Sequence, residues 1–335
     1  MRYLITGGSG YIGTRLTQIL GERDECERIV NVDVRPPDVP LPKTSFVSGD
    51  VRDSAAMRAL LEREEIDCLI HLAFILDPIR DEARMYDVDV NGTMAVLKAA
   101  SQAEIDQVLV TSSATAYGAF PDNPEPIAED WPVRGQPEFA YARDKADMDR
   151  ICQLWAEQHP EATMTIIRPS IVFGPSVKNY IVRSWENQPF FPHLDGVDTN
   201  FQLIHEDDLV DGLILLLDKK AGGAFNFAGD GTMTWRESAE ILGTKTRKMS
   251  FKTASAIAKW SWLLHLPRTE APPGNLHFIR YPWVVSNEKL KSETGWEPQY
   301  TTRETFEITM RARGLLGAGG ETADVSAPVS GPPVA

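Results

Sequence analysis

Tyr141 and Lys145, four residues apart, are the pair in this sequence best suited to proton transfer. Residues four apart share one face of a helix, so the two side chains are expected to lie together. An ammonium group beside a phenol stabilises the phenolate, so Lys145 is expected to lower the pKa of Tyr141 from about 10. Such a tyrosine can take a proton from an alcohol or give one to a carbonyl. A surface tyrosine and lysine on a solvated helix would show the same spacing.

A serine at the end of a predicted strand is the third candidate for this chemistry. The apolar run Val108-Leu109-Val110 leads into Thr111-Ser112-Ser113. The carboxyl ends of strands in α/β folds are where ligands are contacted. Ser113 is therefore expected to hydrogen-bond the substrate oxygen while Tyr141 moves the proton. The alternative is a turn that is simply rich in serine and threonine.

The N-terminal run from Thr6 to Gly13 holds the glycines Gly7, Gly8, Gly10 and Gly13 between an apolar strand and a helix. Glycines let the backbone approach a ligand closely, and the N-terminus of the helix favours a pyrophosphate. Asp33 ends a second apolar run 20 residues past Gly13. A carboxylate there accepts adenosine ribose hydroxyls and repels a 2′-phosphate, which favours NAD over NADP. Arg35 is the one feature that favours NADP instead. Asp33 and Arg35 could also be ordinary charged residues of a loop.

The elements that must position these residues alternate along the chain. Apolar runs at 46–47, 68–73, 108–110, 163–167 and 224–227 alternate with helical patterns at 54–64, 81–103, 141–159 and 205–217. This predicts an α/β fold, a Rossmann-type doubly wound parallel sheet with a smaller C-terminal α/β substrate lobe. We expect the dinucleotide-binding domain at 1–173 plus 203–230 and the lobe at 174–202 plus 231–312. Residues 313–335 are expected to be a disordered tail.

The composition narrows the partners to small molecules. The chain has 335 residues and a net charge of −14, so its surface should repel nucleic acid and anionic membranes.

The cysteines Cys26, Cys68 and Cys152 show no metal-ligand spacing, which favours no metal site and a reducing, cytoplasmic setting. Because the first predicted strand follows Met1 directly, we expect no signal peptide. Residues 251–267 are too short to span a bilayer and suit a buried helix or a hydrophobic lid over the substrate.

Taken together, the motifs make the chain resemble an extended short-chain dehydrogenase/reductase of the NAD-dependent epimerase/dehydratase family, over about residues 1–312. The motifs that carry the resemblance are Thr6-Gly7-x-x-Gly10-x-x-Gly13, Asp33, Gly49-Asp50-Val51, His71-Leu72-Ala73, Asn91-Gly92-Thr93, Ser112-Ser113-x-x-x-Tyr117-Gly118, Tyr141-x-x-x-Lys145, Arg168-Pro169 and Phe173-Gly174-Pro175, with Ile204-His205-Glu206-Asp207-Asp208 and Thr294-Gly295-Trp296-Glu297-Pro298 further along.

The resemblance implies a role for each matching position. The pyrophosphate would be wrapped by Gly7, Gly10, Tyr11, Ile12 and Gly13, the ribose held by Asp33, the adenine flanked by Asp50 and Val51, and the nicotinamide approached by Leu72, Ala73 and Pro169. Ser113, Tyr141 and Lys145 would be catalytic, with Lys145 also anchoring the nicotinamide ribose. His71 and Asn91 are expected to be structural. The resemblance also implies a homodimer formed through the helices at 81–103 and 141–159.

Departures from the family pattern narrow the chemistry. Ala114 and Thr115 stand where dehydratases resemble one another in an Asp-Glu pair, which argues against a dehydratase. Ile171 and Phe201 stand where many members that act on sugar nucleotides have Asn and Arg. Substitute cations could come from Arg183, Arg268 or Arg280. The aromatic residues Trp260, Trp262 and Trp283 would suit a less polar substrate.

Two enzymatic hypotheses remain open at this point. Family frequency favours oxidation of a secondary alcohol within a nucleotide-sugar 4-epimerase reaction. The departures at Ile171 and Phe201 favour a net dehydrogenase or reductase of a less polar substrate, similar to the hydroxysteroid dehydrogenases. A hypothesis of another class is a dinucleotide-sensing protein without turnover, although such proteins usually lack the Tyr/Lys pair or the serine.

Overall fold

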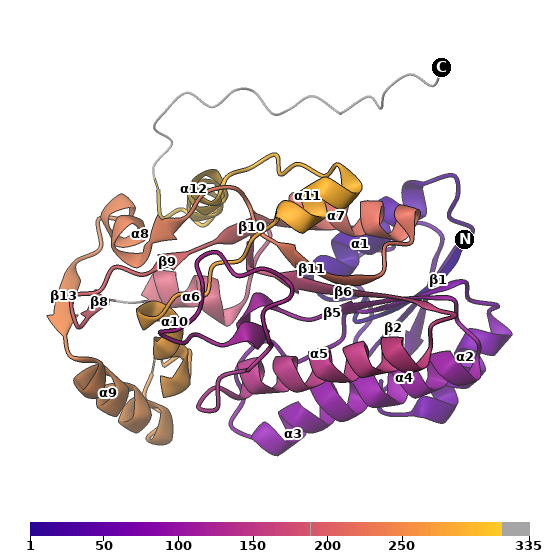
Figure 1. Ribbon diagram of the computed structural model, residues 1–335, viewed down its shortest axis with the longest axis horizontal. Coiled ribbons are helices and arrows are strands. Elements are labelled where there is room, and N and C mark those ends of the chain that lie inside the picture. Colours follow the sequence, from indigo (N-terminus) through magenta and orange to yellow (C-terminus); the bar gives the residue numbers. More distant parts are fainter. Residues whose placement is uncertain (188, 268, 317–335) are drawn as a thin grey trace.

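A parallel sheet of seven strands forms the centre of the computed structural model, which describes residues 1–187, 189–267 and 269–316 (Figure 1). The strand order is β11-β6-β5-β4-β1-β2-β3. The bounds are β1 (Arg2–Thr6), β2 (Arg28–Asp33), β3 (Thr44–Ser48), β4 (Cys68–His71), β5 (Gln107–Thr111), β6 (Thr163–Pro169) and β11 (Gly223–Phe227). The order reverses between β1 and β4, and ligands bind at such a switch point in doubly wound folds. The predicted fold class is confirmed.

Helices cover both faces of the sheet because the inner strands are apolar on both sides. One face packs against α1 (Tyr11–Glu22) and α7 (Glu206–Lys219), and the other against α2 (Ser54–Arg63), α4 (Gly92–Gln102) and α5 (Ala140–Gln158).

The helix predicted at 81–103 is interrupted. It consists of α3 (Glu82–Tyr86), a π-helical turn (Asp87–Asn91) and α4. The extra residue of a π-turn often accompanies a functional site.

The smaller lobe lies beyond the carboxyl ends of the strands (Figure 1). Its helices are α6 (Tyr180–Asn187), α8 (Trp235–Ile241), α9 (Phe251–Leu263), α10 (His277–Arg280) and α12 (Thr302–Ala312). Its strands form three short pairs, β7 (Ile171–Phe173) with β10 (Leu203–His205), β9 (Asn200–Phe201) with β12 (Met233–Thr234), and β8 (Phe191–Leu194) with β13 (Thr246–Met249). A stacked aromatic cluster that includes Trp185, Phe201 and Trp235 forms its core.

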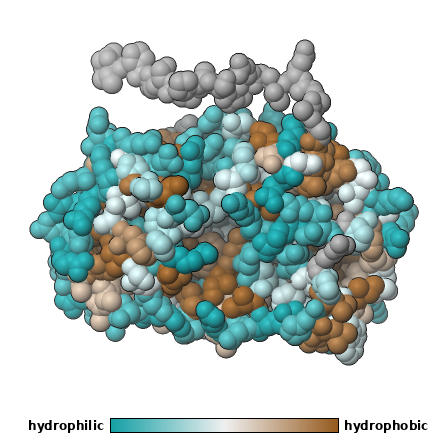
Figure 2. All heavy atoms as spheres, turned by 180° about the vertical axis from the view of Figure 1, so that it is seen from behind, coloured by the Kyte–Doolittle hydropathy of each residue, from teal (hydrophilic) through white to brown (hydrophobic). Residues whose placement is uncertain are grey.

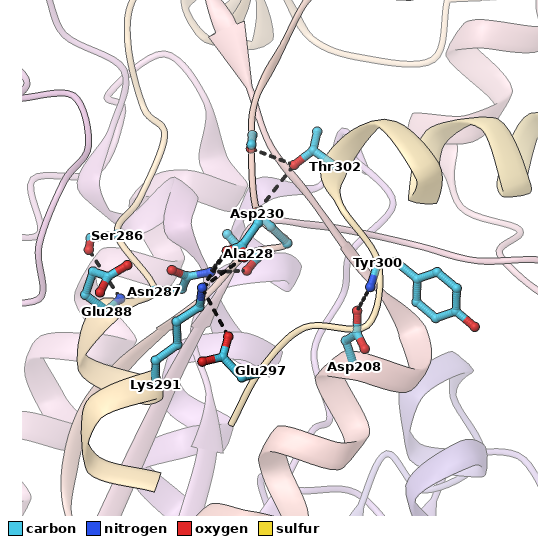
Figure 3. A network of polar contacts seen from close by, with 12 residues as sticks. Asp208, Ala228, Asp230, Ser286, Asn287, Glu288, Lys291, Glu297, Tyr300 and Thr302 are labelled. Carbon is cyan, nitrogen blue, oxygen red and sulfur yellow. Dashed lines mark hydrogen bonds and ion pairs between the residues drawn. The ribbon is translucent and has the colours of Figure 1, made fainter. Parts of the chain in front are cut away.

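Part of the segment that we assigned to the lobe packs on the dinucleotide-binding half instead. Helix α11 (Glu288–Thr294) lies against β11, and Leu290 and Trp296 belong to the same buried cluster as Phe227. Figure 3 shows how polar contacts fix this segment, with Lys291 Nζ 2.8 Å from Asp230 Oδ1. In the same view Asp208 accepts a hydrogen bond from the Tyr300 backbone. The predicted tail is described only over 313–316, so the rest of that prediction falls outside the described residues.

Candidate active site

The glycine loop lies where its pattern predicts, between β1 and α1. Gly7 has a φ of +73°, and a Cβ there would come within 2.7 Å of the Ala73 backbone nitrogen. A Cβ at Gly13 would come within 2.2 Å of the Gly7 carbonyl oxygen, so a side chain is excluded at both positions. Gly10 caps α1 without a side-chain hydrogen bond. The first N–H groups of α1 are therefore left to bind an anion, as a pyrophosphate requires.

Asp33 lies at the end of β2, against the glycine loop. Its Oδ2 accepts a hydrogen bond from the Ser9 backbone N–H at 3.2 Å, and its Oδ1 accepts one from Arg35 N–H at 3.2 Å. The carboxylate is thus fixed beside the loop by backbone donors. Loop, helix terminus and acid together fit the pyrophosphate and the adenosine ribose of a dinucleotide.

Only some of the residues expected around the adenine and the nicotinamide line the main cavity. Asp50 is held by Arg52, whose Nε donates to Oδ1 at 2.9 Å, and this ion pair lowers the pKa of Asp50. Val51 is buried and packs beside Gly92. One cavity of about 530 Å³ is lined by many of the expected residues, namely Gly7, Gly10, Tyr11, Ile12, Gly13, Leu72, Ser113, Tyr141 and Pro169. Asp33, Asp50, Val51, Ala73 and Lys145 do not line it.

Ser113 and Tyr141 meet at this cavity from two different elements. Ser113 follows β5, and its Oγ accepts a hydrogen bond from Thr115 N–H at 3.1 Å. Tyr141 lies in the first turn of α5 and packs between Phe74 and Phe139. Burial raises the pKa of Tyr141 above its ordinary value, and the neighbouring Ser113 hydroxyl opposes that rise. The two groups that sequence analysis expected at the reacting oxygen do line one site.

Lys145 is held by a backbone carbonyl group at the end of β5. Its ammonium donates to the Thr111 carbonyl oxygen at 2.7 Å and lies 3.5 Å from the centre of the Phe74 ring. The centre of the Tyr141 ring is 5.9 Å away. Because burial disfavours the charged form, the pKa of Lys145 falls to about 8. The predicted lowering of the Tyr141 pKa is wrong, because burial raises it.

Asp89 is a buried acid that sequence analysis missed. It lies in the π-helical turn, and its Oδ1 accepts a hydrogen bond from Ile75 N–H at 2.8 Å. Its Oδ2 is buried and has no hydrogen-bond partner among the described residues. Burial raises the pKa of Asp89 to about 7, and the charge of Lys145 opposes that rise. The only feature of the sequence that could have indicated this buried acid is its position between Val88 and Val90 in a predicted amphipathic helix.

The motif residues expected to be structural are placed accordingly. His71 is buried between Thr6 and Thr93, with its ring nitrogens 2.7 and 3.0 Å from their hydroxyl oxygens. Burial lowers the pKa of His71 to about 3, so the imidazole is neutral. Asn91 is exposed and donates to Asp87. Among the described residues, no cluster of three metal-ligating side chains occurs.

The other half of the cavity is lined mainly by aromatic side chains. Its aromatic lining consists of Phe74, Phe139, Tyr180, Trp185, Phe191, Trp235, Phe278 and Trp283. No Lys, Arg or His is among the lining residues of the described chain, and the one charged group is Glu270. That carboxylate is already paired with Arg183, at 3.1 Å from Nε. The lining therefore suits an uncharged, mostly apolar guest.

The positions that depart from the family pattern explain this lining. Ile171 contributes an apolar wall, and Phe201 is fully buried with its ring 4.4 Å from that of Trp235. Arg183 is paired with Asp77 and Glu270, and Arg280 is paired with Asp195. Neither arginine lines the cavity, and Arg268 lies outside the described residues.

The tryptophans expected near the substrate divide into two groups. Trp283 lines the cavity, whereas Trp260 and Trp262 do not. Their helix α9 contributes the small residues Ala258 and Ser261 to the lining. Trp185 and Trp235 also line it. They are brought there from α6 and α8, elements that the irregular lobe sequence did not reveal.

The model of the NAD dependent epimerase/dehydratase family matches residues 3–228. The chain belongs to this family. Membership agrees with the glycine loop and Asp33, and it confirms the expectation of NAD as the cofactor.

Curated relatives in the family differ in what they do. An uncharacterized protein of Mycobacterium tuberculosis is 24% identical over 93% of this chain and 84% of its own length. The human dTDP-D-glucose 4,6-dehydratase is 25% identical over 92% and 89%. The UDP-glucose 4-epimerase of Lactobacillus helveticus is 28% identical over 90% and 93%. These identities support the family and not one reaction.

Solved structures agree with the fold. A UDP-glucose 4-epimerase from Thermotoga maritima, solved with UDP-glucose, has a TM-score of 0.71 at 18% identity, covering 94% of this chain and 99% of the other. A dTDP-glucose 4,6-dehydratase from Streptomyces venezuelae, solved with NAD and TYD, has the same TM-score at 21% identity and the same coverage. The full-length match extends the family fold into the smaller lobe.

Proposed function

We propose that this protein is an NAD-dependent oxidoreductase that interconverts a secondary alcohol and its ketone on an uncharged, largely apolar substrate. The observation that carries the proposal is one cavity in which Ser113 and Tyr141 face an aromatic wall, with no Lys, Arg or His among the described lining residues. A nucleotide diphosphate brings negative charges that are costly to bury unpaired. A substrate with one hydroxyl and an apolar body meets no such cost.

Tyr141 is proposed to move the proton. In the oxidative direction its phenolic oxygen accepts the hydroxyl proton of the substrate, and in the reductive direction it returns a proton to the ketone oxygen. Ser113 would orient that oxygen by a hydrogen bond. NAD, when bound, supplies the acceptor for the hydride that leaves the same carbon. It would be held by the glycine loop, the N-terminus of α1 and Asp33.

Lys145 is proposed to act through its charge and its reach, and not through a hydrogen bond to Tyr141. Its ammonium is fixed on the Thr111 carbonyl, at the strand end that leads to Ser113. From there it can serve a ribose hydroxyl, as the resemblance implies, and contribute positive potential to the developing phenolate.

A nucleotide-sugar epimerase is the second candidate because relatives and solved neighbours include UDP-glucose 4-epimerases. Oxidation of a secondary alcohol is common to both reactions, so the Tyr141 step is unchanged. A dehydratase is less well supported, because Ala114 supplies no acid or base. Thr115 donates its hydroxyl to Ser113 at 2.9 Å, which also gives no group for elimination.

A homodimer through α4 and α5 is proposed as well. The two helices pack side by side on one face of the sheet (Figure 1). Each exposes a large apolar residue, Met94 and Leu154. Light scattering should give a dimer mass for the wild type and a monomer mass for Leu154→Arg. A dimer mass for both would place the interface elsewhere.

The Tyr141→Phe variant tests the assignment of the proton donor. We expect the rate of NADH formation from a neutral secondary alcohol to fall by about 10²-fold or more. Tyr86→Phe, on the half-exposed face of α3, is the matched control and should keep the wild-type rate. NAD binding measured by calorimetry should persist in both variants. Full turnover by Tyr141→Phe would remove Tyr141 from the mechanism, and NAD binding without turnover on any alcohol would favour a sensing protein.

A further inference from the structure

Helix α9 exposes an apolar surface that nothing in the described chain covers. Of the fourteen large apolar side chains that the described residues expose, five lie between residues 257 and 266. These are Ile257, Trp260, Leu263, Leu264 and Leu266. Only Ala254 of α9 is buried. Ile257, Trp260 and Leu264 follow the three- and four-residue spacing of one helix face, so they form a continuous stripe. Figure 2, the view from behind, shows apolar side chains gathered at the lower right, at the end that carries α9.

The charge around this stripe is opposite to that of the whole protein. Residues 241–267 contain five Lys or Arg and no Asp or Glu, in a chain of net charge −14. The five cations are Lys245, Arg247, Lys248, Lys252 and Lys259, and all are exposed. None forms an ion pair among the described residues, although Arg247 lies over the Phe190 ring. Strand β13 and α9, which carry them, lie at one end of the molecule (Figure 1).

The same helix forms part of the cavity wall. Ala258 and Ser261 line the cavity, one residue away from the exposed Ile257 and Trp260. The end of α9 is also attached to the dinucleotide-binding half. Arg80 Nη2 donates to the Trp262 carbonyl oxygen at 3.1 Å, and its guanidinium lies 4.6 Å from the centre of the Trp262 ring. Arg80 follows the segment that places Phe74 and Leu76 on the cavity wall. The exposed stripe is therefore fixed beside the cavity.

We propose that the exposed stripe of α9 and its cationic flank dock this protein on an anionic lipid surface. A helix with apolar and aromatic residues on one face and lysines beside it lies in the plane of a membrane interface. Each Lys or Arg near an anionic leaflet adds attraction, and tryptophan favours the headgroup region. The charge complementarity selects a lipid surface over another copy of this acidic chain. No described helix is both long and apolar enough to cross a bilayer, so contact would be peripheral.

This proposal differs from the expectation drawn from net charge. The overall charge of −14 predicts repulsion from an anionic membrane, but screening limits that repulsion to about 10 Å at ordinary ionic strength. Residues 241–267 carry five cations and no acid, although Asp195 accepts a hydrogen bond from Phe251 N–H at the start of α9. One consequence rests on the proposed function, namely that a docked α9 would place the aromatic cavity next to the bilayer and let an apolar alcohol enter from it. The docking itself does not depend on that substrate.

Vesicle sedimentation of the full chain tests the docking without any substrate. Vesicles of phosphatidylglycerol and phosphatidylcholine in equal parts should carry the protein into the pellet, and vesicles of phosphatidylcholine alone should not. Raised salt should release the protein, because screening weakens the cationic contribution. Sedimentation with neither vesicle, or equally with both, would overturn the proposal.

Two pairs of variants locate the surface. Trp260→Ser/Leu264→Ser and Lys252→Glu/Lys259→Glu should each lower partitioning to anionic vesicles by about tenfold or more. The matched controls are Val34→Ser/Val39→Ser, which removes two other exposed apolar residues, and Lys98→Glu/Lys219→Glu, which reverses two exposed charges elsewhere. Both controls should partition like the wild type. Equal loss in the controls would contradict a role for α9.

Two further measurements separate the docking proposal from the proposed enzymatic function and from self-association through α9. Trp260→Ser/Leu264→Ser should oxidise a water-soluble secondary alcohol at the wild-type rate, because neither side chain lines the cavity. Failure of all alcohols as substrates would leave vesicle binding intact and would count against the proposed function alone. Light scattering should give the same mass for this variant and the wild type. A smaller mass for the variant would show that α9 is covered by a second copy of the chain and would overturn the docking.

Discussion

The ammonium nitrogen of Lys145 lies 2.7 Å from the carbonyl oxygen of Thr111, the last residue of β5. This contact places the ammonium at the strand end that leads to Ser113, 5.9 Å from the centre of the Tyr141 ring. Helix spacing alone does not reveal this choice of partner. Because the ammonium is buried, its charge is sensitive to the other buried charge nearby, Asp89.

The Asp89→Asn variant tests this buried pair through the pH dependence of stability. The folded protein holds the Asp89 pKa at about 7, above its ordinary value, so burial of the carboxylate favours the protonated form. That contribution to the free energy of unfolding is present below about pH 4 and is lost as the pH rises to about 7. An amide can still accept the hydrogen bond from Ile75 N–H. We therefore expect the variant to gain about 2–4 kcal/mol relative to wild type between pH 5 and pH 8.

Denaturant unfolding of both proteins at these two pH values measures the difference. Asp38→Asn, at an exposed loop position, is the control and should show no pH-dependent gain. If the difference in unfolding free energy between Asp89→Asn and wild type is the same at both pH values, burial does not raise the pKa of this carboxyl group.

The Gly7→Ala variant tests the glycine loop, and the chain offers a matched control. Gly7 and Gly231 both have a φ of +73°, but a Cβ would strike the Ala73 backbone at Gly7 and meets nothing within 4 Å at Gly231. Gly231→Ala should cost only the backbone strain, about 1–2 kcal/mol of unfolding free energy. Gly7→Ala should cost more and should lower NAD affinity by about tenfold or more, because the loop must move away from the pyrophosphate. Equal stability and NAD affinity in the two variants would contradict the close approach.

The Phe201→Arg variant tests whether a cation at the family position could face the substrate. Phe201 is fully buried on Trp235, so an arginine would be buried without a partner. We expect a loss of more than about 4 kcal/mol in unfolding free energy and no new affinity for a nucleotide sugar. Phe201→Leu should lose only about 1–2 kcal/mol, since it keeps most of the apolar volume. A stable Phe201→Arg protein that binds UDP-glucose would show that the cavity can be converted by one residue.

Sequence patterns predicted those parts of the site in which one residue type is required by local geometry. The glycine loop after β1, the acid at the end of β2 and the hydroxyl after β5 are such features, and the structure places them at these element ends. The partner of Lys145 could not be predicted, because it depends on how α5 packs against the end of β5. The aromatic wall was only partly foreseen, since Trp185 and Trp235 come from short lobe helices with weak periodicity. The break at Asp89 within the predicted long helix left no signal beyond a single acid.

The most direct test of the account compares two substrate classes on the wild-type protein with NAD. One is a panel of uncharged polycyclic and long-chain secondary alcohols, and the other is UDP-glucose. NADH is followed by its near-ultraviolet absorbance, and the sugar is analysed for inversion at the oxidised carbon. We predict NADH formation from at least one apolar alcohol, loss of that turnover in Tyr141→Phe, and neither NADH nor an inverted sugar from UDP-glucose. Inversion of UDP-glucose with no turnover of the apolar panel would contradict the account.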